Sequence, residues 1–252
     1  MSSTTATAAP IKVSDNKANK TTLKSSRQIG QIPLYVIKGL SLIIEKPHEQ
    51  RCFNALHVSF DVKHNMLVLV ANSGKAMLLV RRPAIEGCKD FEPFLLPYEA
   101  CPPALELGQD PKCELGLYIG RSRKHKTRHV FLRGANRNVS CPELLEPYPD
   151  FWKFIPLYSN EDAGQFNPII LIQLYEALQW VVGEARLPEV RTYQNGTKPI
   201  LMVHDECRVI GVMKCWRLRQ NSSHWREAAL REFGLLPSAT LEFPNARTAQ
   251  AR

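Results

Sequence analysis

One pattern recurs three times along this chain: a segment with helical apolar spacing, followed by short strands joined by turns. In the first copy, the apolar positions of PLYVIKGLSLIIEK, from Pro33, recur at the spacing of a helix, although Gly39 is unfavourable inside one. In the stretch that follows, Leu56, Val58 and Phe60 alternate with polar neighbours, as in a strand. MLVLVA and KAMLLVRR predict a second and a third strand, and turn signals separate the three strands at 63–65 and 72–74. This unit therefore predicts a helix and three antiparallel strands.

The second and third copies follow the same order. FLLPYEACPPALELG, from Phe94, predicts a strand and a short helix broken by prolines, and ELGLYIGRSRKHKTRHVFLRG predicts two strands around a basic turn. In the third copy, Asn167 is suited to cap a helix with Pro168 in its first position, and the dipeptide NG at 195–196 predicts a hairpin before a closing strand. The predicted fold class is α+β, with repeated helix-plus-antiparallel-meander units at 32–87, 92–156 and 165–218.

Three stretches lie outside these units or between them. Residues 1–27 are rich in Ser, Thr, Ala and Lys and predict a disordered basic arm. The connector EPYPDFWKFIP, 146–156, is crowded with prolines and aromatic rings, a composition that excludes a regular helix or strand. Residues 219–252 predict a tail in which HWREAALREFGLL, from His224, forms a short amphipathic helix.

The net charge and the cysteine spacing indicate which kinds of partner and site the protein can have. The chain carries 33 Lys and Arg against 24 Asp and Glu, a formal net charge of +9, which makes nucleic acid the first candidate for an acidic partner. Its seven cysteines form no CxxC pair and no Cys/His cluster with zinc spacing, so we predict reduced thiols in a cytoplasmic protein, without metal or cofactor. No apolar run approaches the roughly 18 residues of a membrane span.

Three segments resemble the DNA sliding clamps of the bacterial DNA polymerase III beta type. LHVSFDVKHNMLVLVANSGKAMLLV is similar to the paired strands of that family that lead into an ATDGHRLA-like turn, of which Gly74 is kept and the aspartate, histidine and arginine are not. YPDFWKFIP resembles the interdomain segment FPDYRRVIP. FNPIILIQLYEAL, PILMV and VIGVMKCWRL resemble the last helix and the closing strands, which end in a VMPMRL-like segment.

The resemblance implies a DNA-clamp-like fold in which 28–157 form a domain of two half-repeats and 158–218 form half of a further domain. It also implies a non-enzymatic, DNA-binding and protein-tethering factor in DNA replication or repair. The partners implied are DNA, bound without sequence preference, DNA polymerase or repair proteins that carry short clamp-binding peptides, and further copies of the chain in an oligomer. An alternative is a clamp-fold protein-interaction module that does not encircle DNA.

A nucleic-acid enzyme is a third alternative, for which the sequence shows no recognisable site. It contains no nucleophile elbow, no P-loop, no HExxH and no defensible pair of catalytic carboxylates.

Two sets of site residues follow. The peptide-binding positions carried over from the resemblance are Gly74, Lys75, Met77, Pro149, Lys153, Phe154, Val212, Met213 and Trp216. The DNA-binding candidates lie on the first helix and in the basic turn: Lys38, Lys46, Arg121, Arg123, Lys124, Lys126 and Arg128. The rings of the connector either line the peptide site or fix one domain to the next. The second role is favoured for Phe151 and Trp152, and both roles stay open for Phe154.

Overall fold

The structure of the protein is a computed structural model. It describes residues 11–15, 26–44, 51–121, 128–156, 166–183, 190–193, 199–204 and 209–214. By its contacts the chain divides into two units, 1–216 and 217–252. The second unit, which contains the predicted tail helix, lies outside the described residues, so that prediction stays untested.

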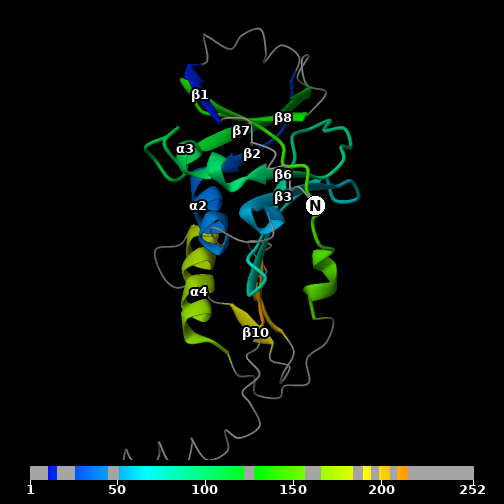
Figure 1. Cartoon of the computed structure of the whole chain (residues 1–252), viewed down its shortest axis with the longest axis vertical. Helices are drawn as coiled ribbons and strands as arrows, with labels where there is room; N and C mark the ends of the chain where they lie inside the picture. Colours follow the sequence, from blue (N-terminus) through cyan, green and yellow to red (C-terminus); the bar gives the residue numbers. More distant parts are fainter. Residues whose placement is uncertain are drawn as a thin grey trace, which may run out of the picture. The chain divides into compact units, whose positions relative to one another are not determined.

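A five-stranded antiparallel sheet joins the first two repeats (Figure 1). Its strand order is β1-β9-β8-β7-β2. The strands are β1 (Lys12–Asp15), β2 (Arg27–Pro33), β7 (Glu114–Arg121), β8 (Arg128–Arg133) and β9 (Arg137–Pro142). Because β2 precedes the first helix and pairs with β7 of the second repeat, the two repeats exchange their first strands.

A seven-stranded antiparallel sheet joins the first and third repeats. Its order is β10-β11-β12-β5-β4-β3-β6, so β12 of the third repeat pairs with β5 of the first. The strands are β3 (Ala55–Asp61), β4 (Met66–Asn72), β5 (Ala76–Pro83), β6 (Phe94–Pro97), β10 (Arg191–Tyr193), β11 (Ile200–His204) and β12 (Val209–Met213). Because β5 pairs with β12, residues that are far apart in the sequence lie side by side at this seam in the sheet.

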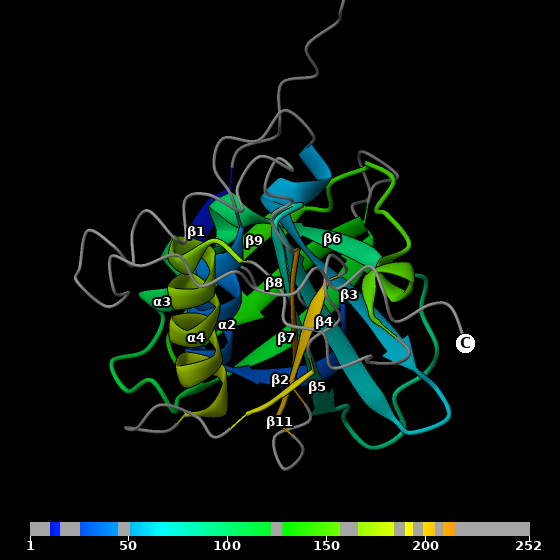
Figure 2. The ribbon, with the colours of Figure 1, turned by 90° about the horizontal axis from the view of Figure 1, so that it is seen from below.

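Within the described residues, three α-helices accompany the sheets: α2 (Leu34–Ile43), α3 (Cys101–Leu105) and α4 (Pro168–Val182). Short 3-10 helices occupy Arg51–Asn54, Tyr98–Ala100 and Phe151–Phe154. Helix α4 begins as predicted, because the Asn167 Oδ1 atom accepts the Ile169 N–H at 2.9 Å, and it ends at Gly183 in a left-handed conformation. Helices α2 and α4 lie side by side against one face of the seven-stranded sheet (Figure 2).

Gly39 explains how α2 and α4 approach so closely. A Cβ atom on Gly39 would lie 2.5 Å from the Val181 Cγ2 atom and 2.6 Å from the Ala177 carbonyl oxygen. The residue that is unfavourable for helix formation is therefore the one that admits the neighbouring helix.

Strand β4, MLVLVAN, is buried along its whole length because both faces of its sheet are covered. Alternate side chains point to opposite faces. Leu67 and Leu69 face the core beneath α2 and α4, whereas Val68 and Val70 face a second, smaller apolar cluster on the other side. The connector supplies Phe151 to that second cluster and so covers this face.

The predicted helices and strands of the repeats are present within the described residues, and the helix predicted from Asn167 is confirmed as Pro168–Val182. Two details were wrong. The arm at 1–27, predicted to be disordered, contains β1 and the start of β2. The second repeat also has a further strand, β9, beyond the three strands predicted for it. Strand β1 is the short polar sequence KVSD, without apolar periodicity, and it forms through pairing with β9, with Lys12 opposite Ser140.

Candidate functional site

Three separate segments meet on the face of the seven-stranded sheet opposite α2 and α4. The turn between β4 and β5 meets β12, because Val212 pairs with Met77 across the seam and the Lys214 N–H donates to the Lys75 carbonyl oxygen at 2.8 Å. The connector joins them through Phe151, which packs in the same apolar cluster as Met77 and Val212. We call this surface the seam surface: the turn 72–77, the connector residues 148–156, and the exposed face of β11 and β12.

The turn at 72–77 is held rigidly. The Asn72 Oδ1 atom accepts the Gly74 N–H at 2.7 Å, and the Ser73 Oγ atom accepts the Ala76 N–H at 3.1 Å. Gly74 has a φ angle of 77°, in the left-handed region where other residues are strained. The turn therefore presents Gly74 and Lys75, both exposed, in a fixed position beside β12.

The connector is anchored by one ring and leaves two others exposed. Phe151 is only 5 % exposed, as predicted for a ring that fixes the connector. Trp152 is 56 % exposed, so its burial gives no support to the role of fixing one domain to the next that the sequence favoured for it. Phe154 is 46 % exposed and is available to a ligand. An ion pair of 3.4 Å between Lys153 and Asp150 closes the single 3-10 turn that carries these rings.

The peptide-binding residues predicted from the resemblance fall into three groups. Gly74, Lys75, Lys153 and Phe154 are exposed on the seam surface, Pro149 is half-buried there, and Met77 and Val212 form its apolar floor. Met213 lies on the opposite face of β12, in the core under α4, so the structure separates it from the site. Trp216 lies outside the described residues.

Three apolar residues of this surface were missed. Ile155, Leu201 and Ile210 are half-buried and pack against the same cluster as Phe151. Leu201 pairs with Val212 across β11 and β12, so it shares the face of Val212. PILMV is apolar throughout, so only the pairing of Leu201 with Val212 assigns Leu201 to this face.

A buried histidine lies beneath the connector. His57 contacts Phe151 edge to face, with ring centroids 5.2 Å apart, and stacks on Tyr148. Burial lowers the pKa of His57 from 6.5 to about 4, because the charged form loses its hydration. Burial also raises the pKa of Tyr148, so both groups stay neutral at physiological pH. In this structure neither the His57 Nδ1 nor the Tyr148 Oη atom has a hydrogen-bond partner.

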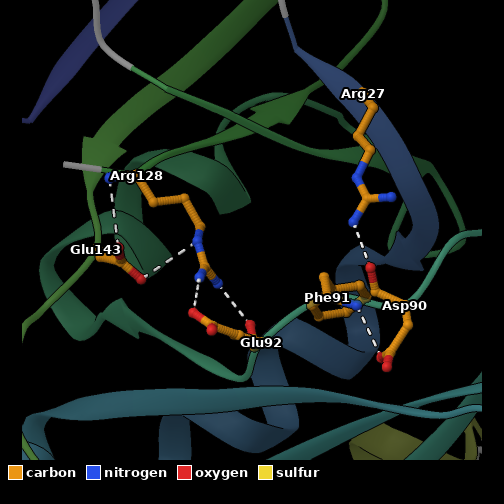
Figure 3. Close-up of polar contacts among 6 residues, drawn as sticks. All are labelled: Arg27, Asp90, Phe91, Glu92, Arg128 and Glu143. Atoms are coloured by element: carbon orange, nitrogen blue, oxygen red, sulfur yellow. Dashed lines mark hydrogen bonds and ion pairs between the residues drawn. The ribbon is translucent and has the colours of Figure 1, made fainter. Parts of the chain in front are cut away.

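Arg128, one of the DNA-binding candidates, is held by acidic residues of its own chain (Figure 3). Its guanidinium donates to the Glu92 carbonyl oxygen at 2.5 Å and lies 3.6 Å from a Glu143 carboxylate oxygen and 3.5 Å from the Glu92 carboxylate. It also stacks over the Phe94 ring, 5.6 Å from the centroid. These contacts tie the start of β8 to the segment before β6.

Arg27 fixes the same segment from β2. It donates to the Asp90 carbonyl oxygen at 2.9 Å, and its guanidinium lies 6.0 Å from the centroid of the Phe91 ring (Figure 3). The Asp90 carboxylate in turn accepts the Phe91 N–H at 2.8 Å. Two arginines of the five-stranded sheet thus hold residues 90–92 in place.

The other DNA-binding candidates remain predictions. Lys38 is half-buried on α2, and the side chain of Arg121 is not described. Lys46, Arg123, Lys124 and Lys126 lie outside the described residues. Helices α3 and α4 carry no Lys or Arg.

Other site classes find no support in the described part of the chain. It holds no helix long and apolar enough to span a membrane. The described residues also bring together no group of His, Cys, Asp and Glu suited to a metal ion.

No family model matches this sequence, and no curated protein is similar to it. The structure, by contrast, is similar to solved sliding clamps. The beta subunit of Pseudomonas aeruginosa superposes with a TM-score of 0.60 at 12 % identity, covering 77 % of this chain and 68 % of that one. The clamp of Bacillus subtilis gives 0.59 at 11 % identity, over 77 % and 65 % of the two chains.

A third similar structure carries a ligand. The beta clamp of Helicobacter pylori, bound to a DNA ligase peptide, gives a TM-score of 0.58 at 13 % identity, over 77 % of this chain and 66 % of that one. The chain thus has the fold of a DNA sliding clamp. The clamps that define this likeness are DNA polymerase III beta subunits, and this chain spans about two thirds of their length.

Proposed function

We propose that this protein is a non-enzymatic tethering factor of DNA replication or repair, which binds DNA without sequence preference and holds partner proteins by short apolar peptides. The observation that carries the proposal is the meeting of the turn 72–77, the connector and β12 on one surface. The Helicobacter pylori clamp of the same fold is bound to a ligase peptide.

The chemistry of the seam surface favours apolar peptide side chains. Phe154 is an exposed ring, and Ile155, Leu201 and Ile210 are half-buried around the cluster that Phe151 fills. A few desolvated apolar side chains supply most of the affinity in such contacts. Backbone rigidity of the turn at Gly74 limits the entropy lost on binding.

The second candidate is a clamp-fold interaction module that does not encircle DNA. One observation favours it: α3 and α4 carry no basic residue, and α2 carries only Lys38, which is half-buried. Phosphate contacts need cations on the surface that faces DNA.

One experiment separates the two candidates. A DNA duplex is immobilised for surface plasmon resonance, the full chain is passed over it at low salt, and a DNA ligase peptide of the kind bound by the Helicobacter clamp is then injected. The tethering factor gives a protein signal that a second, peptide-dependent signal follows. The interaction module binds the peptide in solution and gives no signal on DNA. A chain that binds neither contradicts both functions.

A further inference from the structure

A cleft lies where the first turn of α2 meets the end of α4, and we call it the α2–α4 cleft. It has a volume of about 660 Å³, within the size range of ligand-binding clefts. Its walls include Pro33 and Tyr35 at the start of α2, Pro111 in the loop before β7, and Trp180 near the end of α4. Because α2 and α4 cover the face of the seven-stranded sheet opposite the seam surface, this cleft is a separate site.

The walls of the cleft are held together by the backbone. The Tyr35 N–H donates to the Pro111 carbonyl oxygen and the Leu34 N–H donates to the Cys113 carbonyl oxygen, both at 3.0 Å. Gly183, which also lines the cleft, lies against the Tyr35 ring, since a Cβ atom on it would be 3.8 Å from that ring. The cleft is therefore formed before a ligand arrives, which limits the free energy lost in ordering it.

Two aromatic rings are accessible inside the cleft. Trp180 is 39 % exposed and Tyr35 is half-buried, and both line the cleft. The face of an aromatic ring carries negative potential and attracts cations, with tryptophan the most effective ring. These two rings therefore favour a flat cationic group.

The loop that forms one wall is acidic, although the chain as a whole carries a net charge of +9. Its sequence, ELGQDPKCE at 106–114, contains three acidic residues and one basic residue, Lys112. Glu114 lines the cleft, and its side chain is 47 % exposed. Its carboxylate lies 3.9 Å from the Arg82 guanidinium, at the limit of an ion pair, so it remains open to a second cation.

Helix α4 adds negative potential at the other wall. The helix ends in the cleft at Val182 and Gly183, where the negative end of its dipole lies. Its last turn contains no basic residue that would offset this potential. Both walls therefore favour a cation, and Lys112 is the one residue of the lining that opposes it.

We infer that the α2–α4 cleft binds an arginine side chain of a partner protein. A guanidinium group is planar, so it stacks on Trp180 and Tyr35 while it donates hydrogen bonds to the Glu114 carboxylate. A lysine ammonium has no flat face and makes only the second contact well. A cleft of this size holds more than one side chain, so residues that flank the arginine enter with it.

Fluorescence anisotropy on the full chain tests the inference. The probe is a peptide with one arginine among glycines and serines and an uncharged fluorophore, and matched peptides carry lysine or glutamine in place of arginine. We expect saturable binding of the arginine peptide, about 10-fold weaker binding of the lysine peptide and none of the glutamine peptide. The net charge of +9 repels a basic peptide, so binding requires a local acidic site. Equal binding of all three peptides, or no binding of the arginine peptide, overturns the inference.

Two tryptophan variants assign the binding to the cleft. Trp180→Ala is expected to weaken binding of the arginine peptide about 5- to 30-fold, because a cation–π contact is lost. Trp152→Ala is the matched control, since it removes an exposed tryptophan from the seam surface, and it should bind as the wild type does. Weaker binding in Trp152→Ala and unchanged binding in Trp180→Ala would place the peptide on the seam surface and overturn the inference.

Two charge variants provide a test that does not depend on Trp180→Ala folding. Glu114→Gln should weaken binding of the arginine peptide about 5-fold and reduce its dependence on salt. Lys112→Ala should strengthen binding about 2- to 3-fold, because it removes a like charge from the cleft. Both residues are exposed, so neither substitution disturbs the core. No change in either variant, or a change in the same direction in both, contradicts the inference.

Discussion

The imidazole ring of His57 stacks on the phenol ring of Tyr148, with ring centroids 4.8 Å apart and an interplanar angle of 25°. His57 belongs to β3 and Tyr148 to the connector, so this contact fixes the connector to the sheet. Protonating His57 would place a charge in a buried contact in which its Nδ1 atom has no hydrogen-bond partner.

Lowering the pH should therefore lower the free energy of unfolding through the protonation of His57. Its folded pKa of about 4 lies below its ordinary value of 6.5, so the unfolded chain binds the proton more tightly. Above pH 6.5 the histidine is neutral in both states and has no effect. Between pH 6.5 and 4 it should lower the free energy of unfolding by about 1.4 kcal/mol per pH unit.

Urea denaturation at pH 7.0 and pH 4.5 measures this loss. His57→Phe keeps an aromatic ring against Tyr148 without a titrating group, so we expect it to lose most of the difference between the two pH values. Val62→Phe, which adds an exposed ring in the turn after β3 and removes no titrating group, should keep that difference. Equal pH dependence in wild type and His57→Phe would show that another group controls acid stability.

The two neighbouring rings of the connector should respond differently to truncation. Phe151→Ala removes a buried ring and is expected to lower the free energy of unfolding by about 3–5 kcal/mol. Trp152→Ala removes an exposed ring that contacts Phe151 at 4.8 Å between centroids, and should cost at most about 1 kcal/mol. Chemical denaturation compares both variants, and similar losses would mean that the connector does not pack as described.

Gly39→Ala sets two effects against each other. Alanine favours the helix by about 1 kcal/mol, but its Cβ atom would lie 2.6 Å from the Ala177 carbonyl oxygen, and a backbone atom cannot turn aside. We expect the overlap to dominate and to lower the free energy of unfolding by about 1–3 kcal/mol. Lys38→Ala, also on α2, is the control and should change it by less than about 0.5 kcal/mol. Stabilisation by Gly39→Ala would show that α2 and α4 lie further apart.

The basic turn and Arg128 should have separable effects on DNA binding. Binding of a fluorescent duplex, measured at several salt concentrations, gives a log–log slope of about −0.9 for each phosphate neutralised. Alanine at Arg123, Lys124 and Lys126 should flatten that slope. Arg128→Ala should leave the slope nearly unchanged and instead lower stability, because Arg128 is paired with Glu92 and Glu143. A slope that only Arg128→Ala changes would reverse these roles.

Much of the fold could be predicted from local patterns. The alternation around Val58, the cap at Asn167 and the apolar spacing after Pro33 each specify an element without reference to the rest of the chain. Strand β1 could not be predicted in this way, because its pairing with β9 depends on a partner more than 100 residues away.

The candidate site was less predictable, because it depends on register and tertiary pairing. The sequence places Val212 beside Met213, but only the pairing of β12 with β5 shows that Val212 faces the connector and Met213 the core. Likewise, Arg128 belongs to a basic run in the sequence, and its pairing with Glu143 becomes visible only when β8 is placed beside β9. A one-residue difference along a strand thus decides which residues belong to a site.

The affinity of the full chain for a fluorescent DNA ligase peptide, measured by anisotropy, tests the central claim most directly. The seam surface predicts saturable binding that Phe154→Ala weakens about 10- to 100-fold, because an exposed ring at the site is lost. Val62→Ala, at an exposed apolar residue remote from the connector, should bind as the wild type does. Absence of binding, or equal affinity in wild type and Phe154→Ala, would contradict the claim that this surface holds partner peptides.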